Sequence, residues 1–249
     1  MKRSVRITFF LCLISTLCAI LLTSCNIPIQ LYTLSGLEYR INEDGETCTI
    51  IGIGKYKSTD LEIPEKIGDY MVTTIGKEAF CAGRYEQCAN LTSITLPEGL
   101  TTIEDFAFMG CKKVKEIIVP DTVTTINTGA FQECVQLEKL ILPKGLTTIS
   151  VQMCIGCQSL KEIKIPDSVI EIKDAAFAEA GLETVTLGKN VKRIEGFAFL
   201  SYYKSANAVY YEGTLAQWQE IERGSAWIGD KDCTFHCQDF EGMIEEVYQ

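Results

Sequence analysis

The sequence predicts a β-rich solenoid, in which short strands from successive repeats stack side by side. Five stretches start at Leu91, Val114, Leu137, Leu160 and Leu182, spaced 23, 23, 23 and 22 residues apart. The same apolar positions recur inside each stretch. A unit this short cannot bury its own apolar side, whereas stacked copies bury one another's and form one continuous core. With an earlier, stretched copy that runs from Leu61 to Phe80, we expect about six units of 22–23 residues.

The apolar positions form columns when the units are aligned. The first two columns are Ile94, Ile117, Leu140, Ile163 and Val185, and then Leu96, Val119, Leu142, Ile165 and Leu187. Later columns are Leu100, Val123, Leu146, Val169 and Val191; Ile103, Ile126, Ile149, Ile172 and Ile194; and Phe108, Phe131, Cys154, Phe177 and Phe199. We therefore expect all of these side chains in the core.

Each unit begins with a short strand that a proline ends. In the unit that starts at Leu91, Ile94 and Leu96 alternate with Ser93 and Thr95, so the apolar pair faces inward and the polar pair faces outward. Pro97 lacks an amide hydrogen and fixes its own φ, which ends the strand and begins a turn. Prolines recur at this position until the last unit, where Gly188 stands instead.

The repeated pattern Leu-x-x-Ile-x-Leu-Pro-x-x-Leu-x-x-Ile-x-x-x-Ala-Phe-x-x-Cys resembles the BspA-like class of bacterial leucine-rich repeats. The resemblance covers roughly residues 37 to 240. It implies a surface or secreted protein with a hairpin cap before the repeats and a closing cap after them, where Val209 to Trp218 resembles the closing element. Met153-Cys154, in place of the usual Ala-Phe, is a local departure.

The N-terminus has the pattern of a bacterial lipoprotein signal. Lys2, Arg3 and Arg6 precede an apolar run over 7–22, which is short for a permanent membrane span. The following Thr-Ser-Cys resembles a lipobox, which implies that Cys25 is lipidated. We expect a protein anchored by lipid at the bacterial cell envelope, on the extracytoplasmic membrane surface. A cleaved signal that releases the protein and a retained helix are the alternatives.

The domain organisation follows from these segments. We expect a signal peptide over 1–24, a lipidated tether over 25–35, an N-terminal hairpin cap over 36–57, repeats over 58–205, and the last-repeat extension with the C-terminal cap over 206–249.

The net charge argues against some partners. The formal charge is −10, and loss of the three basic residues in 1–24 would make it −13. No basic stripe is present that could neutralise phosphates, so we expect no binding to nucleic acid and none to anionic lipid through charge.

Nine cysteines remain after Cys12, Cys18 and Cys25 are set aside. Cys88, Cys111, Cys134 and Cys157 share one column, which favours small buried side chains. Cys154 and Cys157 have the spacing of half a zinc site, but no second pair stands at a suitable distance, and we expect no metal. Cys81 with Cys88, and Cys233 with Cys237, are candidate disulfides in an oxidising compartment.

The sequence offers no clear catalytic site. His236 is the single histidine and has no nucleophile motif beside it. Gly52 and Gly54 are a fragment of a dinucleotide motif and fit a hairpin better. We therefore predict no enzyme and no cofactor, although a pair of glycosidase carboxylates stays open.

The outward side chains of the strands form the candidate binding face. They are Ser93, Thr95, Glu116, Ile118, Lys139, Ile141, Glu162, Lys164, Thr184 and Thr186. Ile118 and Ile141 point outward on adjacent units between charged neighbours, which is the composition of a protein-binding patch. The alternative interpretation is that exposed isoleucine reflects strand propensity.

We expect a cell-surface protein that binds other macromolecules, in particular proteins, through this face, in adhesion or in host or community interaction. A structural spacer lipoprotein is one alternative. A glycan-binding or glycan-processing envelope protein is another, since aromatic residues gather near the C-terminus at Tyr202, Tyr203, Tyr210, Tyr211, Trp218 and Trp227. We favour a capping role there, because Trp218 and Ile221 are spaced to cover the last repeat.

Overall fold

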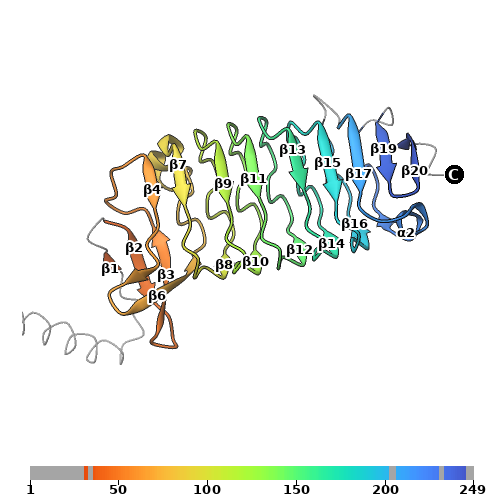
Figure 1. Cartoon of the computed structure of the whole chain (residues 1–249). Helices are drawn as coiled ribbons and strands as arrows, with labels where there is room; N and C mark the ends of the chain where they lie inside the picture. The colour runs from red at the N-terminus through yellow and green to blue at the C-terminus, as the bar shows by residue number, and fades with distance from the viewer. Residues whose placement is uncertain (1–30, 33–35, 202–205, 230–232, 245–249) are drawn as a thin grey trace, which may run out of the picture. The chain divides into compact units, whose positions relative to one another are not determined.

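The computed structural model describes residues 31–32, 36–201, 206–229 and 233–244 (Figure 1). Most of the predicted signal and tether, including Cys25, lies outside these residues. The described part from residue 36 onward is a stack of short strands, as the sequence predicts. Its helices are a single 3₁₀ turn, η1 (Glu86–Asn90), and a single α-helix, α2 (Leu215–Gln219). None of the described helices is long and apolar enough to cross a membrane.

Two rows of strands run along the stack (Figure 1). The first row contains β4 (Asp60–Glu62), β7 (Ser93–Thr95), β9 (Glu116–Ile118), β11 (Lys139–Ile141), β13 (Glu162–Lys164), β15 (Thr184–Leu187), β17 (Ala208–Tyr211), β19 (Thr234–Cys237) and β20 (Phe240–Met243). The second row contains β6 (Tyr70–Ile75), β8 (Thr102–Ile103), β10 (Thr125–Ile126), β12 (Thr148–Ile149), β14 (Glu171–Ile172), β16 (Arg193–Ile194) and β18 (Glu222–Arg223). Paired strands within each row are parallel, except β20, which pairs antiparallel with β19.

The hydrogen-bonded ladder of the first row is interrupted twice. The row divides into a sheet of β4 and β7, a sheet of β9 and β11, and a sheet of β13, β15, β17, β19 and β20. No backbone hydrogen bond between described residues joins β7 to β9 or β11 to β13. The second row is interrupted in the same way between β10 and β12. Strands β9 and β11 therefore form a separate two-stranded module in the middle of the first row.

The core is made of the columns that the sequence predicts. Every residue of the five aligned apolar columns is buried. The phenyl rings of Phe80, Phe108 and Phe131 stack with centroid distances of 5.3 and 5.9 Å, and those of Phe177 and Phe199 stack at 5.3 Å. Cys154 occupies the same column between these two groups and is fully buried, as is Met153 beside it. The departure from Ala-Phe therefore keeps both positions in the core.

A third ladder of hydrogen bonds joins the turns that contain Ala-Phe. The amide of each residue in the phenylalanine column donates to a carbonyl of the next unit, as from Phe80 to Ala107 at 2.7 Å and from Phe177 to Ala198 at 2.7 Å. The residue two positions before that column has a left-handed backbone with φ between 52° and 60° in every unit, at Glu78, Phe106, Gly129, Gln152, Ala175 and Phe197. Only one of these is glycine, so five units hold a side chain in a strained conformation.

The N-terminal end of the described stack is a hairpin. Strands β2 (Glu38–Ile41) and β3 (Thr47–Gly52) pair antiparallel, and β3 then pairs parallel with β6. The Asp44 carboxylate accepts hydrogen bonds from the amides of Glu46 and Thr47 at 2.9 Å each, which fixes the turn. Strand β5 (Lys66–Ile67) pairs with β6, and the short strand β1 (Leu31–Tyr32) lies earlier in the chain.

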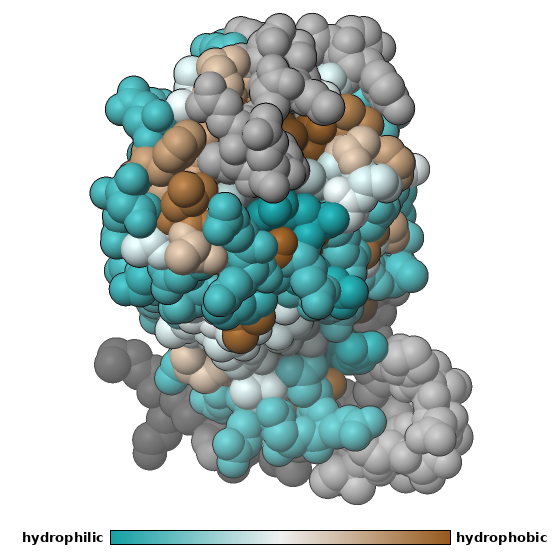
Figure 2. All heavy atoms as spheres, turned by 90° about the vertical axis from the view of Figure 1, so that its right-hand side faces the viewer, coloured by the Kyte–Doolittle hydropathy of each residue, from teal (hydrophilic) through white to brown (hydrophobic). Residues whose placement is uncertain are grey.

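The C-terminal end is covered by aromatic side chains. Helix α2 begins with a capping box between Thr214 and Gln217, and its Trp218 is fully buried. The indole packs against Tyr211, Trp227 and Phe235 at centroid distances of 5.6, 5.6 and 4.6 Å. Figure 2 looks at this end, where hydrophilic residues predominate among those described. The predicted capping role of Trp218 fits this arrangement.

Candidate functional site

The predicted binding face is the outward side of the first row. Side chains alternate along each strand, so that the central residue of β7, β9, β11 and β13 is buried and its two neighbours are exposed. Ser93 and Thr95 lie on β7, Glu116 and Ile118 on β9, Lys139 and Ile141 on β11, and Glu162 and Lys164 on β13. Thr184 and Thr186 on β15 are only half-buried.

Ile118 and Ile141 are directly opposite each other on β9 and β11. Their exposed fractions are 54% and 41%, which leaves much of both side chains in water. The other outward residues of the two strands, Glu116 and Lys139, form an ion pair at 2.6 Å. The two-stranded module therefore presents the apolar pair of Ile118 and Ile141 beside an ion pair in which both charges are satisfied.

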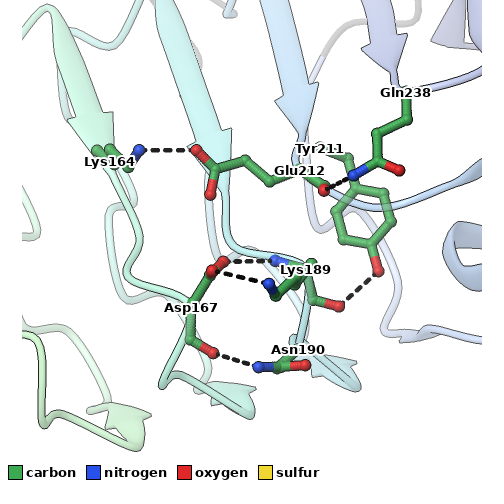
Figure 3. A network of polar contacts seen from close by, with 7 residues as sticks. All are labelled: Lys164, Asp167, Lys189, Asn190, Tyr211, Glu212 and Gln238. Atoms are coloured by element: carbon green, nitrogen blue, oxygen red, sulfur yellow. Dashed lines mark hydrogen bonds and ion pairs between the residues drawn. The ribbon is translucent and has the colours of Figure 1, made fainter.

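Lys164 forms an ion pair that points away from the apolar pair. Its ammonium binds the Glu212 carboxylate at 2.7 Å, across the intervening strand β15 (Figure 3). This hydrogen bond raises the pKa of Lys164. Lys164 therefore extends toward the C-terminal end of the stack, and the apolar pair is not flanked by its charge.

Figure 3 shows further hydrogen bonds in the same region, between the turns that follow these strands. The Asp167 carboxylate accepts a hydrogen bond from the Lys189 amide at 3.1 Å, which is the main cause of its lowered pKa. The hydroxyl of Tyr211 donates to the Lys189 carbonyl at 2.9 Å. These contacts cross from the turn after β13 to β17. A Cβ at Gly188 would lie 2.6 Å from the carbonyl oxygen of Pro166, which explains why glycine replaces proline in this unit.

A hollow of about 430 Å³ lies where the ladder is interrupted between β7 and β9. The small side chains of Ser93 and Thr95 form one side, and Glu116 and Ile118 form the other. Lys115, Glu98 and Pro120 are among the residues that border it. The hollow is thus continuous with the apolar pair through Ile118. Its volume is within the range of pockets that hold small molecules or side chains.

Six lysines on or next to strands β9 to β15 are paired with carboxylates. The pairs are Lys115 with Glu138 at 3.0 Å, Lys139 with Glu116 at 2.6 Å, Lys144 with Asp121 at 2.7 Å, Lys161 with Glu183 at 3.8 Å, Lys164 with Glu212 at 2.7 Å and Lys189 with Asp167 at 3.5 Å. Each pair joins neighbouring or next-neighbouring units, and each is solvent-exposed, so its contribution to stability is small. Their main effect on the face is to neutralise its positive charges.

The aromatic residues near the C-terminus divide between core and surface. Tyr211, Trp218 and Trp227 are buried, and Tyr202 and Tyr203 lie outside the described residues. Tyr210 is 42% exposed and stacks on the His236 imidazole at 4.6 Å with an interplanar angle of 11°. The sequence predicts a capping role for the whole group. Alternation along β17, in which Val209 is buried, is the signal that places Tyr210 outside.

None of the nine cysteines among the described residues is in a disulfide, and this includes both candidate pairs. In the cysteine column, the Sγ atoms of Cys111, Cys134 and Cys157 donate to the carbonyls of the phenylalanine column one unit earlier at 3.4, 3.3 and 3.2 Å. Burial raises the pKa of Cys111 and Cys134, and a contact with Cys154 is the main cause of the raised pKa of Cys157. No group of three or more potential metal ligands gathers among the described residues.

Comparison with known proteins identifies the repeats. Residues 73–205 match the BspA type leucine rich repeat region in six copies. The leucine rich repeat protein of T. pallidum is 23% identical over 78% of this chain and 86% of that chain, with a TM-score of 0.61. A leucine-rich repeat protein of Eubacterium ventriosum is 26% identical over 70% of this chain and 44% of that chain, with a TM-score of 0.57. The pneumococcal vaccine antigen PcpA is 21% identical over 57% of this chain and 35% of that chain, with a TM-score of 0.50. No curated protein matches the sequence.

Proposed function

Because the chain belongs to the BspA-type leucine-rich repeat family, we propose that it is a surface protein of the bacterial envelope that binds a protein partner through the outward side of the first strand row. In this proposal the repeats present a binding surface to the partner, and the protein catalyses no reaction. The repeats hold the outward side chains in a fixed register, so the partner meets a preorganised surface and little ordering entropy is lost on binding.

The observation that carries the proposal is the exposure of Ile118 and Ile141 side by side. An isoleucine that is half in water contributes little to folding, and two of them on adjacent strands make a contiguous apolar spot. The neighbouring ion pair of Glu116 and Lys139 satisfies the charges beside it. An apolar centre with a polar border is the usual composition of a protein–protein contact.

Lipid attachment at Cys25 is the second part of the proposal. Its support is the sequence pattern of the N-terminus, with basic residues, an apolar run and a cysteine after small residues. Cells that express the full chain and grow on an alkyne-labelled fatty acid should label the wild type and not Cys25→Ser. A Cys25→Ser protein that is labelled equally, or a wild type without label, would refute the anchor.

The binding test compares three full-length proteins. Ile118→Ser with Ile141→Ser removes the apolar pair. Ile170→Ser is the matched control, because Ile170 is 51% exposed but directly precedes β14 in the second row. Immobilised wild type and Ile170→Ser should retain the same partner from host or bacterial surface extracts. The double variant should retain at least about tenfold less of this partner. Equal retention by all three would refute this site, and no retained partner would favour the spacer role.

A glycan-binding role is the second candidate, and the observation that favours it is the exposed Tyr210 ring stacked on His236. Flat aromatic surfaces are common in sugar sites, although two stacked rings are also an ordinary cross-strand pair. A glycan array should show binding by wild type that Tyr210→Ala abolishes if this role holds. An array without any binding would remove it.

A further inference from the structure

Among the outward side chains of the first-row strands β4 to β13, the charges without an ion pair to a described residue are all negative. Asp60 and Glu62 on β4, Glu98 after β7 and Glu162 on β13 have no ion pair with any described residue. The lysines nearest to the pair are already occupied by other carboxylates. The first row therefore presents unneutralised carboxylates on both sides of Ile118 and Ile141.

On the N-terminal side, the Asp60 carboxylate is held in place by hydroxyl groups, which do not neutralise its charge. The hydroxyls of Ser93 and Thr92 donate to the Asp60 carboxylate at 2.8 and 3.0 Å. Asp60 is opposite Ser93, and Glu62 is opposite Thr95, so this negative pair stands one strand away from the hollow between β7 and β9. Glu98 borders the hollow itself. Lys115 also borders the hollow, but its charge is paired with Glu138 at 3.0 Å, so the unpaired charge at the hollow is that of Glu98.

From this arrangement we infer that the partner on the strand face is a basic protein segment, in which lysine or arginine side chains flank an aliphatic or aromatic one. The apolar side chain would contact Ile118 and Ile141 and enter the hollow, and the cationic side chains would meet Glu62, Glu98 and Glu162. This inference rests on the proposed function and specifies its partner. A second copy of the chain does not fit, because a protein with a formal charge of −10 repels itself.

The chemistry of the other candidate occupants is less suited to this face. Nucleic acids and anionic lipid headgroups would bring further negative charge to carboxylates that have no counter-ion. A small inorganic cation would meet carboxylates that stand on three different strands or turns, and it would leave the apolar pair uncovered. A basic segment satisfies both features, since its charges complement the carboxylates and its apolar side chain removes the isoleucines from water.

The test is a library of random peptides displayed on phage, selected on the full chain in nonionic detergent and immobilised by a C-terminal tag. Three further proteins are selected in parallel: Ile118→Ser with Ile141→Ser; Glu62→Gln with Glu98→Gln and Glu162→Gln; and a control with Asp69→Asn, Glu133→Gln and Glu220→Gln. The control removes three exposed charges away from the strand face. Thermal unfolding of each protein checks that it is folded.

We expect the wild type and the control to enrich peptides with lysine or arginine beside an aliphatic or aromatic residue. The glutamine variant should bind the selected peptides roughly twofold to fivefold more weakly for each carboxylate lost. Peptides that depend on the isoleucines but show no basic bias would overturn the inference and leave the proposed function standing. Equally weakened peptide binding in the control would show an effect of net charge alone and would overturn the inference. Selection of nothing by the wild type would overturn both.

Discussion

The exchange of Ala-Phe for Met153-Cys154 predicts a strong energetic coupling between two core positions. Both side chains are fully buried, with the larger residue in the small position and the smaller residue in the large one. Their combined volume is thus close to that of alanine and phenylalanine in the other units. Met153→Ala alone should leave a cavity and cost about 2–4 kcal/mol. Cys154→Phe alone should crowd Met153 and cost about 1–3 kcal/mol.

The double variant should recover most of this loss. The new ring would stand between Phe131 and Phe177 and would continue the stacking seen at 5.3 and 5.9 Å elsewhere in the column. Each added ring pair contributes about 0.5–1.5 kcal/mol. We expect the double variant to lie within about 1 kcal/mol of the wild type, which corresponds to a coupling of at least about 2 kcal/mol.

Urea unfolding, followed by circular dichroism, measures the free energy of unfolding of the wild type, the two single variants and the double variant. The slopes of the transitions should agree among the proteins, so that differences in midpoint report stability alone. If the two single changes add to within about 0.5 kcal/mol, the positions are independent and the volume argument is wrong.

Three further outcomes follow from the structure. Gly129→Ala should destabilise the protein more than Gly156→Ala by about 1 kcal/mol in thermal unfolding, since both have positive φ but only the former adds a Cβ 2.5 Å from a phenyl ring; equal losses would contradict this. Trp218→Ala should cost about 3–5 kcal/mol by urea unfolding because the C-terminal aromatic cluster packs on this indole, and a loss below about 1 kcal/mol would refute the cap. Burial raises the pKa of Cys88 to about 12, so the folded state keeps this thiol protonated while the unfolded chain ionises near pH 9. The stability contributed by Cys88 should therefore be complete below pH 9 and should fall as the pH rises toward 12; a melting temperature that does not change with pH would contradict the burial of this thiol. In the same way, iodoacetamide should label the partly exposed Cys237 long before the buried Cys134, and equal labelling of the two would contradict the burial of Cys134.

The sequence predicts the core because each unit repeats the same surroundings. Ile94, Ile117 and Leu140 are buried for one shared reason, so recognising one column assigns its members together. Alternation along the strand also places Ile118 and Ile141 outward, and the repeat spacing puts them opposite each other. The apolar part of the candidate site could therefore be read from the sequence.

The charge pairing and the interruptions of the ladder could not be read in this way. Lys164 meets Glu212, which follows the strand two positions along the row, and this contact depends on the length and direction of both side chains. The hollow depends on the separation of β7 and β9, although Thr95 and Ile118 fit the repeat pattern as well as their neighbours do. Such features depend on the spacing between units, which the pattern within one unit does not specify.

The most direct measurement of the central claim is site-specific photo-crosslinking on living cells. A photoreactive phenylalanine analogue at position 118, in the apolar pair, is compared with the same analogue at position 170, an equally exposed isoleucine outside the strand face. We predict one dominant crosslinked protein from position 118 and none from position 170. The same crosslinked proteins from both positions, or none from either, would contradict a protein-binding strand face.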